Sequence, residues 1–530
     1  MTVPAHDLTI GHTIVNKTGP RSAHGRPPLS EFRPTTERSE GAGGSARLVT
    51  PRRRRSPDRA ERGSRKHSPS GHSPTKEVPL TTTAHVPVAD AAQRRAAVIG
   101  GAFGFFVDMF DVYLPTIALT PALPYFVPAS VPSGTKALIT AGVFVSTLIG
   151  RPLGSLIFGR LADRVGRRRV TLLSVAGCAF TTALIAVLPG HAQIGLWAIA
   201  LMILLRFVDG IFLGGEYTGA IPLAMEIAPR GRRGLYGSLV SIGFPLSYCA
   251  ISLLTFLMLH VAPAGGPRSA YAEWGWRVPF GAGAVLGVVF LVYYSRTVRE
   301  SPVWLATVRT EKRPGPVRTV LFGSARRSFW QVFVLMAGVW FASNMASGLL
   351  PSLLGTQTTL TATEVTGTLV IAQFVHTLCF PLMGALTDRI GRRTFFIACG
   401  VSVGVICAAA FAFLAAGPWS GLPLVFAVTL LIRLSGASMF AVTPSYICER
   451  FPAAVRGSGF GMGYSLPLLV TAGYAYYQDW LGHIVAYAYT PVVLLVLGGA
   501  LILIGALIGP ETKDTDFDTA AERSGVPSAA

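Results

Sequence analysis

Residues 159–168 read Gly-Arg-Leu-Ala-Asp-Arg-Val-Gly-Arg-Arg, and residues 384–393 read Gly-Ala-Leu-Thr-Asp-Arg-Ile-Gly-Arg-Arg. The same loop therefore occurs twice in the chain. A second pair of motifs repeats at nearly the same offset, because Glu226-Ile227-Ala228-Pro229 matches Glu449-Arg450-Phe451-Pro452. Two independent motifs that repeat with nearly the same spacing indicate an internal duplication.

Each repeated loop connects apolar segments that are long enough to cross a bilayer. Lipid offers no hydrogen-bond partner to the backbone, so a crossing segment must be helical, and about 20 apolar residues span the ~30 Å of hydrocarbon. We predict twelve such helices, over residues 96–119, 136–158, 170–188, 196–221, 235–260, 278–295, 329–351, 365–386, 395–416, 422–446, 457–477 and 485–508.

The composition is that of a membrane protein. Of the 530 residues, 51% are hydrophobic and 14% are charged, against about 25% charged in a soluble domain. These values exclude a disordered, collagen-like, coiled-coil or disulfide-rich secreted protein. The net charge is +20, but the basic residues of the body form short clusters between apolar segments, so no nucleic-acid partner is expected.

Residues 1–90 differ from the rest of the chain. They are rich in Pro, Ser, Thr, Gly and Arg and poor in apolar residues, so we predict a disordered basic tail. The run Arg52–Arg55 is typical of a contact with anionic lipid or nucleic acid, or of a solvated leader, and we favour the leader. No apolar segment follows it until about residue 96, so the tail is not a secretory signal.

Charge in the loops predicts the orientation of the helices. One end, here called the basic end, holds the clusters Arg167–Arg169, Arg230–Arg233 and Arg389–Arg393, and the other end holds few basic residues. By the positive-inside rule the basic end and both termini face the cytoplasm. We divide the chain into a cytoplasmic tail (1–90), a first six-helix half (91–295), a cytoplasmic linker (296–328), a second six-helix half (329–508) and a C-terminal cytoplasmic tail (509–530).

The repeated motifs predict a gate at the basic end. Asp163 and Asp388 end their helices, where they can accept hydrogen bonds from the free N–H groups of the next helix. The loop arginines can pair with Glu226 and Glu449 and hold this end shut; the alternative is that they only set topology. The predicted gate residues are Asp163, Arg164, Arg167, Glu226, Asp388, Arg389, Arg392 and Glu449.

Further motifs complete a resemblance to a known family. They are Arg151-Pro152-Leu153-Gly154, Arg206-Phe207-Val208-Asp209-Gly210 with Leu213-Gly214-Gly215-Glu216, Trp274–Phe280 and Glu300–Trp304. With the repeated loops they make residues 91–508 similar to the major facilitator superfamily, first to its metabolite:proton symporters and second to its sugar porters. The resemblance implies an all-α membrane fold of two six-helix repeats and proton-coupled uptake of a small organic acid or zwitterion.

Charges inside the membrane segments are candidates for proton coupling, because a charge in lipid is costly unless it has a partner or lines a cavity. Asp108 and Asp111 lie on one face of the first helix, where two adjacent carboxylates cannot both stay charged cheaply. Arg206, Asp209 and Glu216 share one face of the helix over 196–221. We predict that these five residues couple transport to protons; the alternative is pairing for folding only.

Other polar residues in apolar segments are candidates for substrate binding. Arg151 and Arg433 are further buried cations, and together with Arg206 they favour an anionic substrate, unless internal acids neutralise them. Helix–helix hydrogen bonds are the alternative for the uncharged residues. The predicted substrate-binding residues are Arg151, Asn344, Gln373, His376, Arg433 and Tyr464.

Motifs for other chemistry do not occur in the sequence. It lacks a Walker-type phosphate loop, H-E-x-x-H, paired C-x-x-C and G-x-S-x-G, so neither an ATP-driven pump nor an enzyme is predicted. The six cysteines show no paired spacing, so we expect no disulfide, metal or cofactor. We predict a monomeric secondary transporter of the cell membrane, whose partners are a small-molecule substrate, protons and the lipid bilayer. The alternatives are a proton-coupled exporter, sugar-porter-like uptake or a non-transporting membrane sensor.

Overall fold

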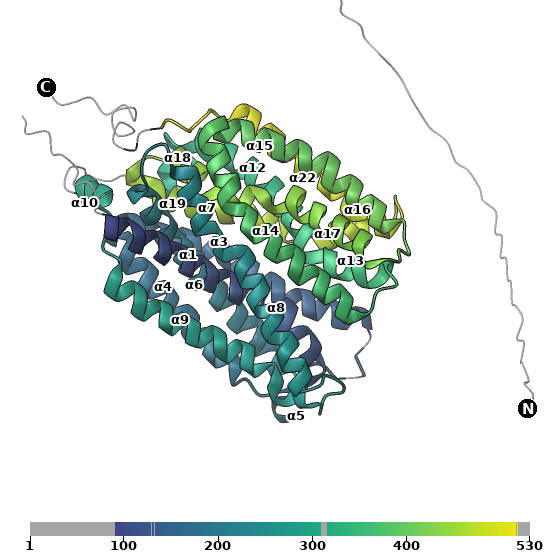
Figure 1. Ribbon diagram of the computed structural model, residues 1–530. Helices are drawn as coiled ribbons and strands as arrows, with labels where there is room; N and C mark the ends of the chain where they lie inside the picture. The colour runs from purple at the N-terminus through teal and green to yellow at the C-terminus, as the bar shows by residue number, and fades with distance from the viewer. Residues whose placement is uncertain (1–90, 129, 132, 309–314, 516, 518–530) are drawn as a thin grey trace, which may run out of the picture. The chain divides into compact units, whose positions relative to one another are not determined.

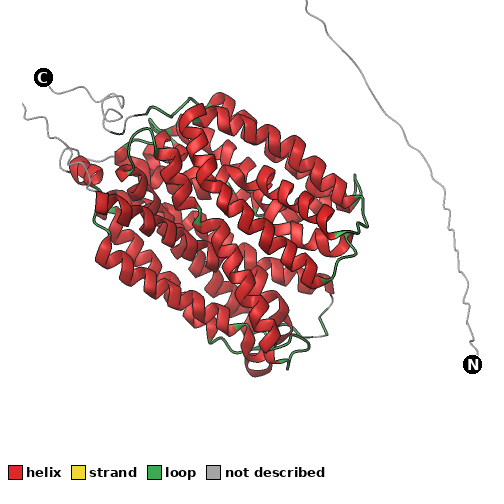
Figure 2. Ribbon diagram, viewed as in Figure 1, coloured by secondary structure: helices red, strands yellow, loops and turns green. Residues whose placement is uncertain are grey.

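The computed structural model describes residues 91–515 and 517, except for 129, 132 and 309–314. The predicted disordered tail, residues 1–90, and most of the C-terminal tail lie outside the described residues. Helices joined by short loops make up nearly all of the described chain (Figure 2), and an isolated bridge joins Thr358 to Trp419.

The first half contains six membrane-spanning segments (Figure 1). Gly166, with φ 119°, allows the tight turn between the second and third segments. The helices are α1 (Ala91–Leu114), which continues through short turns to α2 (Leu123–Phe126), α3 (Ser133–Val165), α4 (Arg167–Ala186), the short α5 (His191–Ile194), α6 (Trp197–Ile227), α7 (Arg233–Ser241) with α8 (Gly243–Val261), and α9 (Arg277–Thr297), preceded by a π-turn at Tyr271–Gly275.

The second half repeats the arrangement, with Gly391 (φ 93°) in the place of Gly166. The linker between the halves carries α10 (Pro302–Val308) and α11 (Pro316–Leu321). The helices of this half are α12 (Arg326–Ser343) with α13 (Leu350–Gln357), α14 (Ala362–Ile390), α15 (Arg392–Val401) with α16 (Ala408–Ala415), α17 (Leu422–Ala437) with α18 (Thr443–Arg450), α19 (Arg456–Ser465), α20 (Leu468–Thr471), α21 (Tyr474–Gly482) and α22 (Thr490–Ile508).

The predicted spans match the observed ones, with one difference. Eleven spans of the described chain are helical and long and apolar enough to cross a membrane. The remaining predicted span, 457–477, is the eleventh in order, and it is divided into α19, α20 and α21. Pro467 and Gly473 lie at the two breaks. Proline has no backbone N–H to donate, and glycine has a low helix propensity.

Small residues bring helices of the two halves together at the basic end. A Cβ on Gly159 of α3 would lie 3.0 Å from the Cα of Ser458 in α19, and a Cβ on Gly384 of α14 would meet the backbone of α7 at Gly234. Each half therefore presses its second span against the other half, as close approach at small residues permits. These two contacts place the repeated loops beside helix starts of the opposite half.

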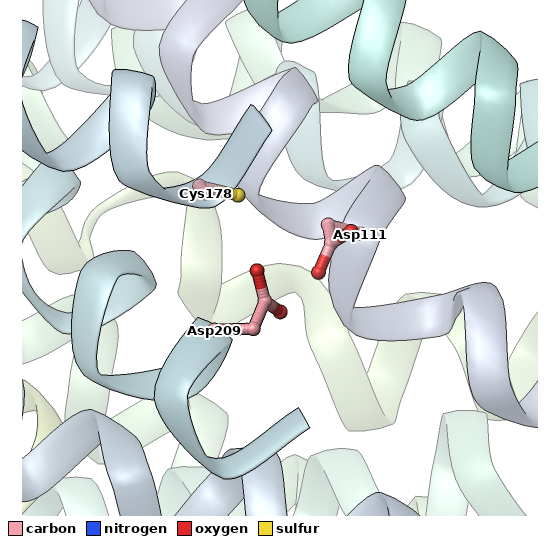
Figure 3. Close-up of side chains that lie close together, drawn as sticks. All are labelled: Asp111, Cys178 and Asp209. Carbon is pink, nitrogen blue, oxygen red and sulfur yellow. The ribbon is translucent and has the colours of Figure 1, made fainter. Parts of the chain in front are cut away.

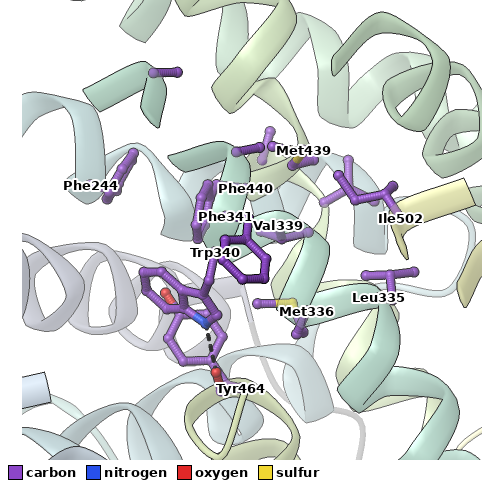
Figure 4. Close-up of a cluster of buried hydrophobic side chains, with 14 of the residues drawn as sticks. Phe244, Leu335, Met336, Val339, Trp340, Phe341, Met439, Phe440, Tyr464 and Ile502 are labelled. Atoms are coloured by element: carbon purple, nitrogen blue, oxygen red, sulfur yellow. Dashed lines mark hydrogen bonds between the residues drawn. The ribbon is translucent and has the colours of Figure 1, made fainter. Parts of the chain in front are cut away.

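Large aromatic side chains fill the space between the two halves next to this contact. Trp340, Phe440 and Tyr464 belong to a buried cluster in which the Trp340 indole N–H donates to the Tyr464 carbonyl at 2.8 Å (Figure 4). The Phe440 ring stacks on Phe244 of the first half, with centroids 4.9 Å apart. Buried aromatics therefore close the space between the halves on the side toward the basic end.

Candidate transport site and gate

A cavity of about 540 Å³ lies between the two halves. Its wall comes from α1, α3 and α8 of the first half and from α12–α14 and α21 of the second. Exposed residues such as Thr116, Thr120 and Ser352 line it near the helix ends that lie away from the basic loops. The cavity therefore opens at the end opposite the basic end, and its volume suits a small metabolite.

Two of the six predicted substrate-binding residues line this cavity in the structure, namely Arg151 and Asn344. The other four, Gln373, His376, Arg433 and Tyr464, are buried behind its wall. The lining also includes aromatic and hydroxyl side chains that the sequence did not single out, because such residues are common in any apolar helix. They are Tyr113, Tyr248, Ser252, Trp340 and Ser347.

Asp108 and Arg151 form a fully buried ion pair. Nη2 of Arg151 donates to both carboxylate oxygens, at 2.7 and 3.0 Å. The guanidinium also lies over the Tyr217 ring, 5.0 Å from its centroid. Because Arg151 lines the cavity, this pair joins the buried interior to the space where a substrate would bind.

Asp111 has a separate partner, so the two acids of α1 are not a free carboxylate pair. Nη1 of Arg206 lies 3.0 Å from Asp111 and 3.2 Å from Asp209. Thr182 and Thr181 donate to these two carboxylates at 2.7 and 2.9 Å. The side chains sit in one buried group with Cys178, whose sulfur lies within 4.8 Å of an oxygen of each acid (Figure 3).

This group suits a shared proton better than a metal ion. One guanidinium balances two carboxylates, which leaves the surplus of one negative charge that a proton removes. The positive charge of Arg206 would also repel a cation held at the same oxygens.

Glu216 is the one acid of this region without a partner in the described part of the chain. It is 1% exposed, and neither carboxylate oxygen has a hydrogen-bond partner there. The carboxyl abuts α1, because a Cβ on Gly104 would lie 2.9 Å from Oε1. Gly104 is one helical turn from Asp108, so Glu216 faces the same surface of α1 as the Asp108–Arg151 pair.

In the second half, the buried charge beside the cavity is a cation, Arg433. Its side chain is 1% exposed, Nη1 donates to Ser347 at 2.7 Å, and its Cζ lies 5.1 Å from the centroid of the Tyr248 ring. Among the described residues it has no carboxylate within ion-pair distance, and Nε and Nη2 have no partner. Ser347 and Tyr248 line the cavity, so a buried, unpaired cation lies directly behind the cavity wall.

Two of the three remaining polar candidates, Asn344 and His376, form hydrogen bonds between helices. Asn344 donates to the carbonyl of Thr471 at 3.3 Å, and His376 Nε2 lies 3.4 Å from the hydroxyl of Ser438. Gln373 is 2% exposed, and its side-chain oxygen has no partner among the described residues. These contacts fit helix–helix packing as well as ligand orientation.

At the basic end, ion pairs join the halves. Glu226 accepts from Arg167 at 3.3 Å within its own half and from Arg456 of α19 at 2.7 Å. The hydroxyl of Ser301 donates to the same carboxylate. In the second half, Glu449 accepts from Arg392 at 3.3 Å and from the hydroxyl of Thr512 at 2.7 Å.

The expected role of Asp163 and Asp388 at the start of the next helix is wrong. Asp163 accepts from the backbone N–H groups of Gly457 and Ser458, at 3.0 and 2.9 Å, and so caps α19 of the opposite half. Asp388 likewise caps α7, through the N–H groups at residues 234 and 235, at 2.8 and 3.0 Å. The reason is the close approach at the two glycines described above, which turns each acid toward the other half.

The starts of α4 and α15 have caps that the sequence analysis missed. Glu300 accepts from the N–H groups of Arg167 and Arg168, at 3.0 and 3.1 Å, and Glu511 accepts from those of Arg392 and Arg393, at 2.8 and 3.1 Å. Partial burial alone would raise the pKa of Glu511. The backbone N–H groups that donate to its carboxylate have the larger combined effect, so the pKa lies below the usual glutamate value. The signal was available, because Glu300-Ser301 and Glu511-Thr512 follow the two halves at matching places.

Two predicted gate residues lie outside the network. Arg164 and Arg389 are exposed, and in the described chain neither side chain forms an ion pair or a hydrogen bond. They face outward because each lies next to a capping aspartate that faces inward. The arginines that do bind Glu226 and Glu449 are one turn further along.

The last described residues of the C-terminal tail also join the halves. Phe517 is 4% exposed, and the guanidinium carbons of Arg233 and Arg456 lie 3.6 and 3.9 Å from its ring centroid. Nη1 of Arg233 also donates to the carbonyl of Thr515 at 2.5 Å. One arginine starts α7 and the other starts α19, so the Phe517 ring contacts both halves at the closed end.

We therefore expect Phe517→Ala to favour opening of the basic end. Buried cation–π contacts contribute up to about 2 kcal/mol. The ratio of closed to open protein should therefore fall about tenfold or more. The measurement is the rate at which a cysteine at Ser458 reacts with a thiol reagent supplied at the basic end. Phe322→Ala is the matched control, because this aromatic residue is 72% exposed; an equal change in both variants would contradict the role of Phe517.

The fold and the site define a membrane transporter, with a central cavity, buried charges beside it and ion pairs that join the halves at one end. The sequence model of the family described as "Sugar (and other) transporter" matches residues 96–317 and 316–523. The chain therefore belongs to this family, within the major facilitator superfamily, and its role is secondary transport rather than enzymatic.

Characterised relatives and solved structures agree. The chain is 30% identical to the alpha-ketoglutarate permease of Escherichia coli, over 76% of this chain and 90% of the permease. It is 28% identical to the ectoine/proline transporter ProP of Corynebacterium glutamicum, over 75% and 80% of the two chains. The structure of the proton:xylose symporter XylE bound to 6-bromo-6-deoxy-D-glucose superimposes with a TM-score of 0.64 at 16% identity, over 82% of this chain and all of XylE, and confirms the fold.

Proposed function

We propose that this protein takes up a small organic acid together with protons by alternating access, with its basic end facing the cytoplasm. In this proposal the cavity is the substrate site, the buried acids of the first half carry the proton, and the ion pairs at the basic end form the cytoplasmic gate. With the basic end inside, the open end of the cavity would face the outside, as expected for an outward-open state.

The observation that carries the proposal is an imbalance of buried charge. Near the cavity, the first half holds four buried acids beside two arginines, whereas Arg433 of the second half has no carboxylate within ion-pair distance among the described residues. Surplus acids can bind protons, and a surplus cation attracts an anion. The two surpluses lie on opposite sides of one cavity, which is the arrangement that a symporter of protons and an anion needs.

The relatives support a carboxylate as the shared chemical feature of the substrate. Alpha-ketoglutarate, proline and ectoine, named for two of the relatives, all carry a carboxylate group. A guanidinium binds this group through charge-assisted hydrogen bonds. Arg433, reached through the wall at Ser347, is the cation best placed to do so.

The test is transport by the purified protein in proteoliposomes with an imposed pH gradient. A panel of mono- and dicarboxylates, zwitterions and sugars is offered, and we expect inward accumulation of a carboxylate. Arg433→Gln should weaken its binding about tenfold to a hundredfold, since a hydrogen bond to a charged group contributes about 1.5–3 kcal/mol. The control is Arg268→Gln, which removes the same charge from an exposed site.

Other outcomes would overturn parts of the proposal. Accumulation of a sugar that Arg433→Gln leaves unchanged would contradict an organic acid and favour sugar-porter-like uptake. Extrusion without accumulation would contradict uptake and favour an exporter.

A further inference from the structure

A second hollow lies on the outside of the first half, at the basic end. Its volume is about 470 Å³, and it is lined by the start of α4, the end of α9 and the start of α10. Four arginines line it, namely Arg168, Arg169, Arg296 and Arg299. It is separate from the transport cavity, with which it shares no lining residue.

Most of the positive charge in this hollow is not balanced by the residues that the structure describes. Arg168 donates to the carbonyls of Val298 and Ser295, at 2.7 and 2.5 Å. Arg169, Arg296 and Arg299 are exposed, and no ion pair or hydrogen bond of their side chains occurs within the described chain. The one acid of the lining, Glu300, is occupied by backbone N–H groups.

The second half shows that the fold does not require these arginines. Arg393 takes the place of Arg168, because it donates to the carbonyls of Ala506 and Leu507, at 3.3 and 2.9 Å. Glu511 takes the place of Glu300. Alignment on these pairs puts Thr394, Leu507 and Pro510 where the first half has Arg169, Arg296 and Arg299. The repeat therefore builds the same loop without the three unpaired charges.

The position and the rim of the hollow suit a lipid headgroup. It lies where α3 and α9 end and α4 begins, which is the level of the bilayer surface. Val165 and Leu305, at its rim, are 38% and 47% exposed and offer an apolar surface to acyl chains. Basic pockets between helices at this level bind the headgroups of anionic lipids.

We propose that this hollow binds the phosphate-bearing headgroup of an anionic phospholipid. The bound lipid would stabilise the closed gate, because the same segment contacts it directly. Ser301 donates to Glu226, and the Trp304 indole N–H donates to the carbonyl of Asp163 at 3.2 Å. The inference does not depend on the substrate or on proton coupling.

The experiment measures the thermal stability of the purified full-length protein during titration with phosphatidylglycerol in phosphatidylcholine nanodiscs. The variant is the triple Arg169→Gln, Arg296→Gln, Arg299→Gln. The control is the triple Arg232→Gln, Arg326→Gln, Arg327→Gln, which removes equal charge from exposed positions at the same end. We expect phosphatidylglycerol to raise the Tm of the wild type and the control, and to bind the variant about a hundredfold more weakly.

Two results would overturn the proposal. An equal response of the variant and the control would show a nonspecific attraction to charged membrane. A rise in Tm with inorganic phosphate that matches the rise with lipid would assign the hollow to a free anion.

Discussion

Replacement of Glu216 by glutamine should abolish uphill accumulation of the substrate, while exchange of labelled for unlabelled substrate continues. Glu216 is buried and has neither an arginine nor a hydrogen-bond donor among the described residues. A carboxyl in such a place is far cheaper to keep neutral than charged, so glutamine should imitate its resting form. The variant keeps the neutral form permanently and cannot release a proton.

The size of the effect follows from the gradient. For one proton per substrate, one pH unit supports about tenfold accumulation, because 1.4 kcal/mol corresponds to a factor of ten. The variant should reach a ratio near one in the same proteoliposomes. Glu273→Gln, at an exposed acid, should behave as the wild type. Full accumulation by Glu216→Gln would assign the proton to the acids paired with arginines instead.

The paired acids give a different result. Asp108→Asn leaves Arg151 buried without its partner, and Asp111→Asn weakens the group around Arg206. Loss of one partner of a buried pair costs about 3–5 kcal/mol. These variants should therefore lower the Tm as well as transport, and the exchange assay with a stability measurement separates coupling from folding.

The fold could be predicted from the sequence because lipid imposes simple rules. Length and hydropathy defined the spans, and the repeated loops defined the two halves. The break within 457–477 escaped prediction, since Pro467 and Gly473 are tolerated in many membrane helices and only packing decides whether they interrupt one.

The site could be predicted in its composition but not in its pairing. Each buried charge was recognisable as an exception in an apolar segment, as Asp108 and Arg433 show. Which acid meets which arginine depends on how helices distant in sequence pack, so the separate pairing of Asp111 with Arg206 and the isolation of Glu216 were not visible. Among the ion pairs at the basic end, the one formed by Arg456 was missed because its partner Glu226 lies in the other half.

The ion pair between Glu226 and Arg456 joins the two halves at the basic end. Arg167 binds Glu226 within one half, so that contact can persist when the halves separate, whereas the 2.7 Å contact between Glu226 and Arg456 must break. Reversal of either charge alone, by Glu226→Arg or Arg456→Glu, should destabilise the closed form by several kcal/mol. The ratio of closed to open protein should then fall more than a hundredfold. The rate of labelling of a cysteine at Ser458 from the basic end measures this ratio, and uptake should fall in parallel.

The double exchange Glu226→Arg with Arg456→Glu should restore part of both signals, because the pair is rebuilt with its charges reversed. Recovery should be incomplete, since Arg167 then lies beside a like charge. Glu226→Arg with Arg164→Glu is the matched control: Arg164 is exposed and does not contact Glu226, so this exchange should restore nothing. If both exchanges restored uptake equally, the charge at the basic end would matter only for topology, and the pairing of Glu226 with Arg456 would not form the gate.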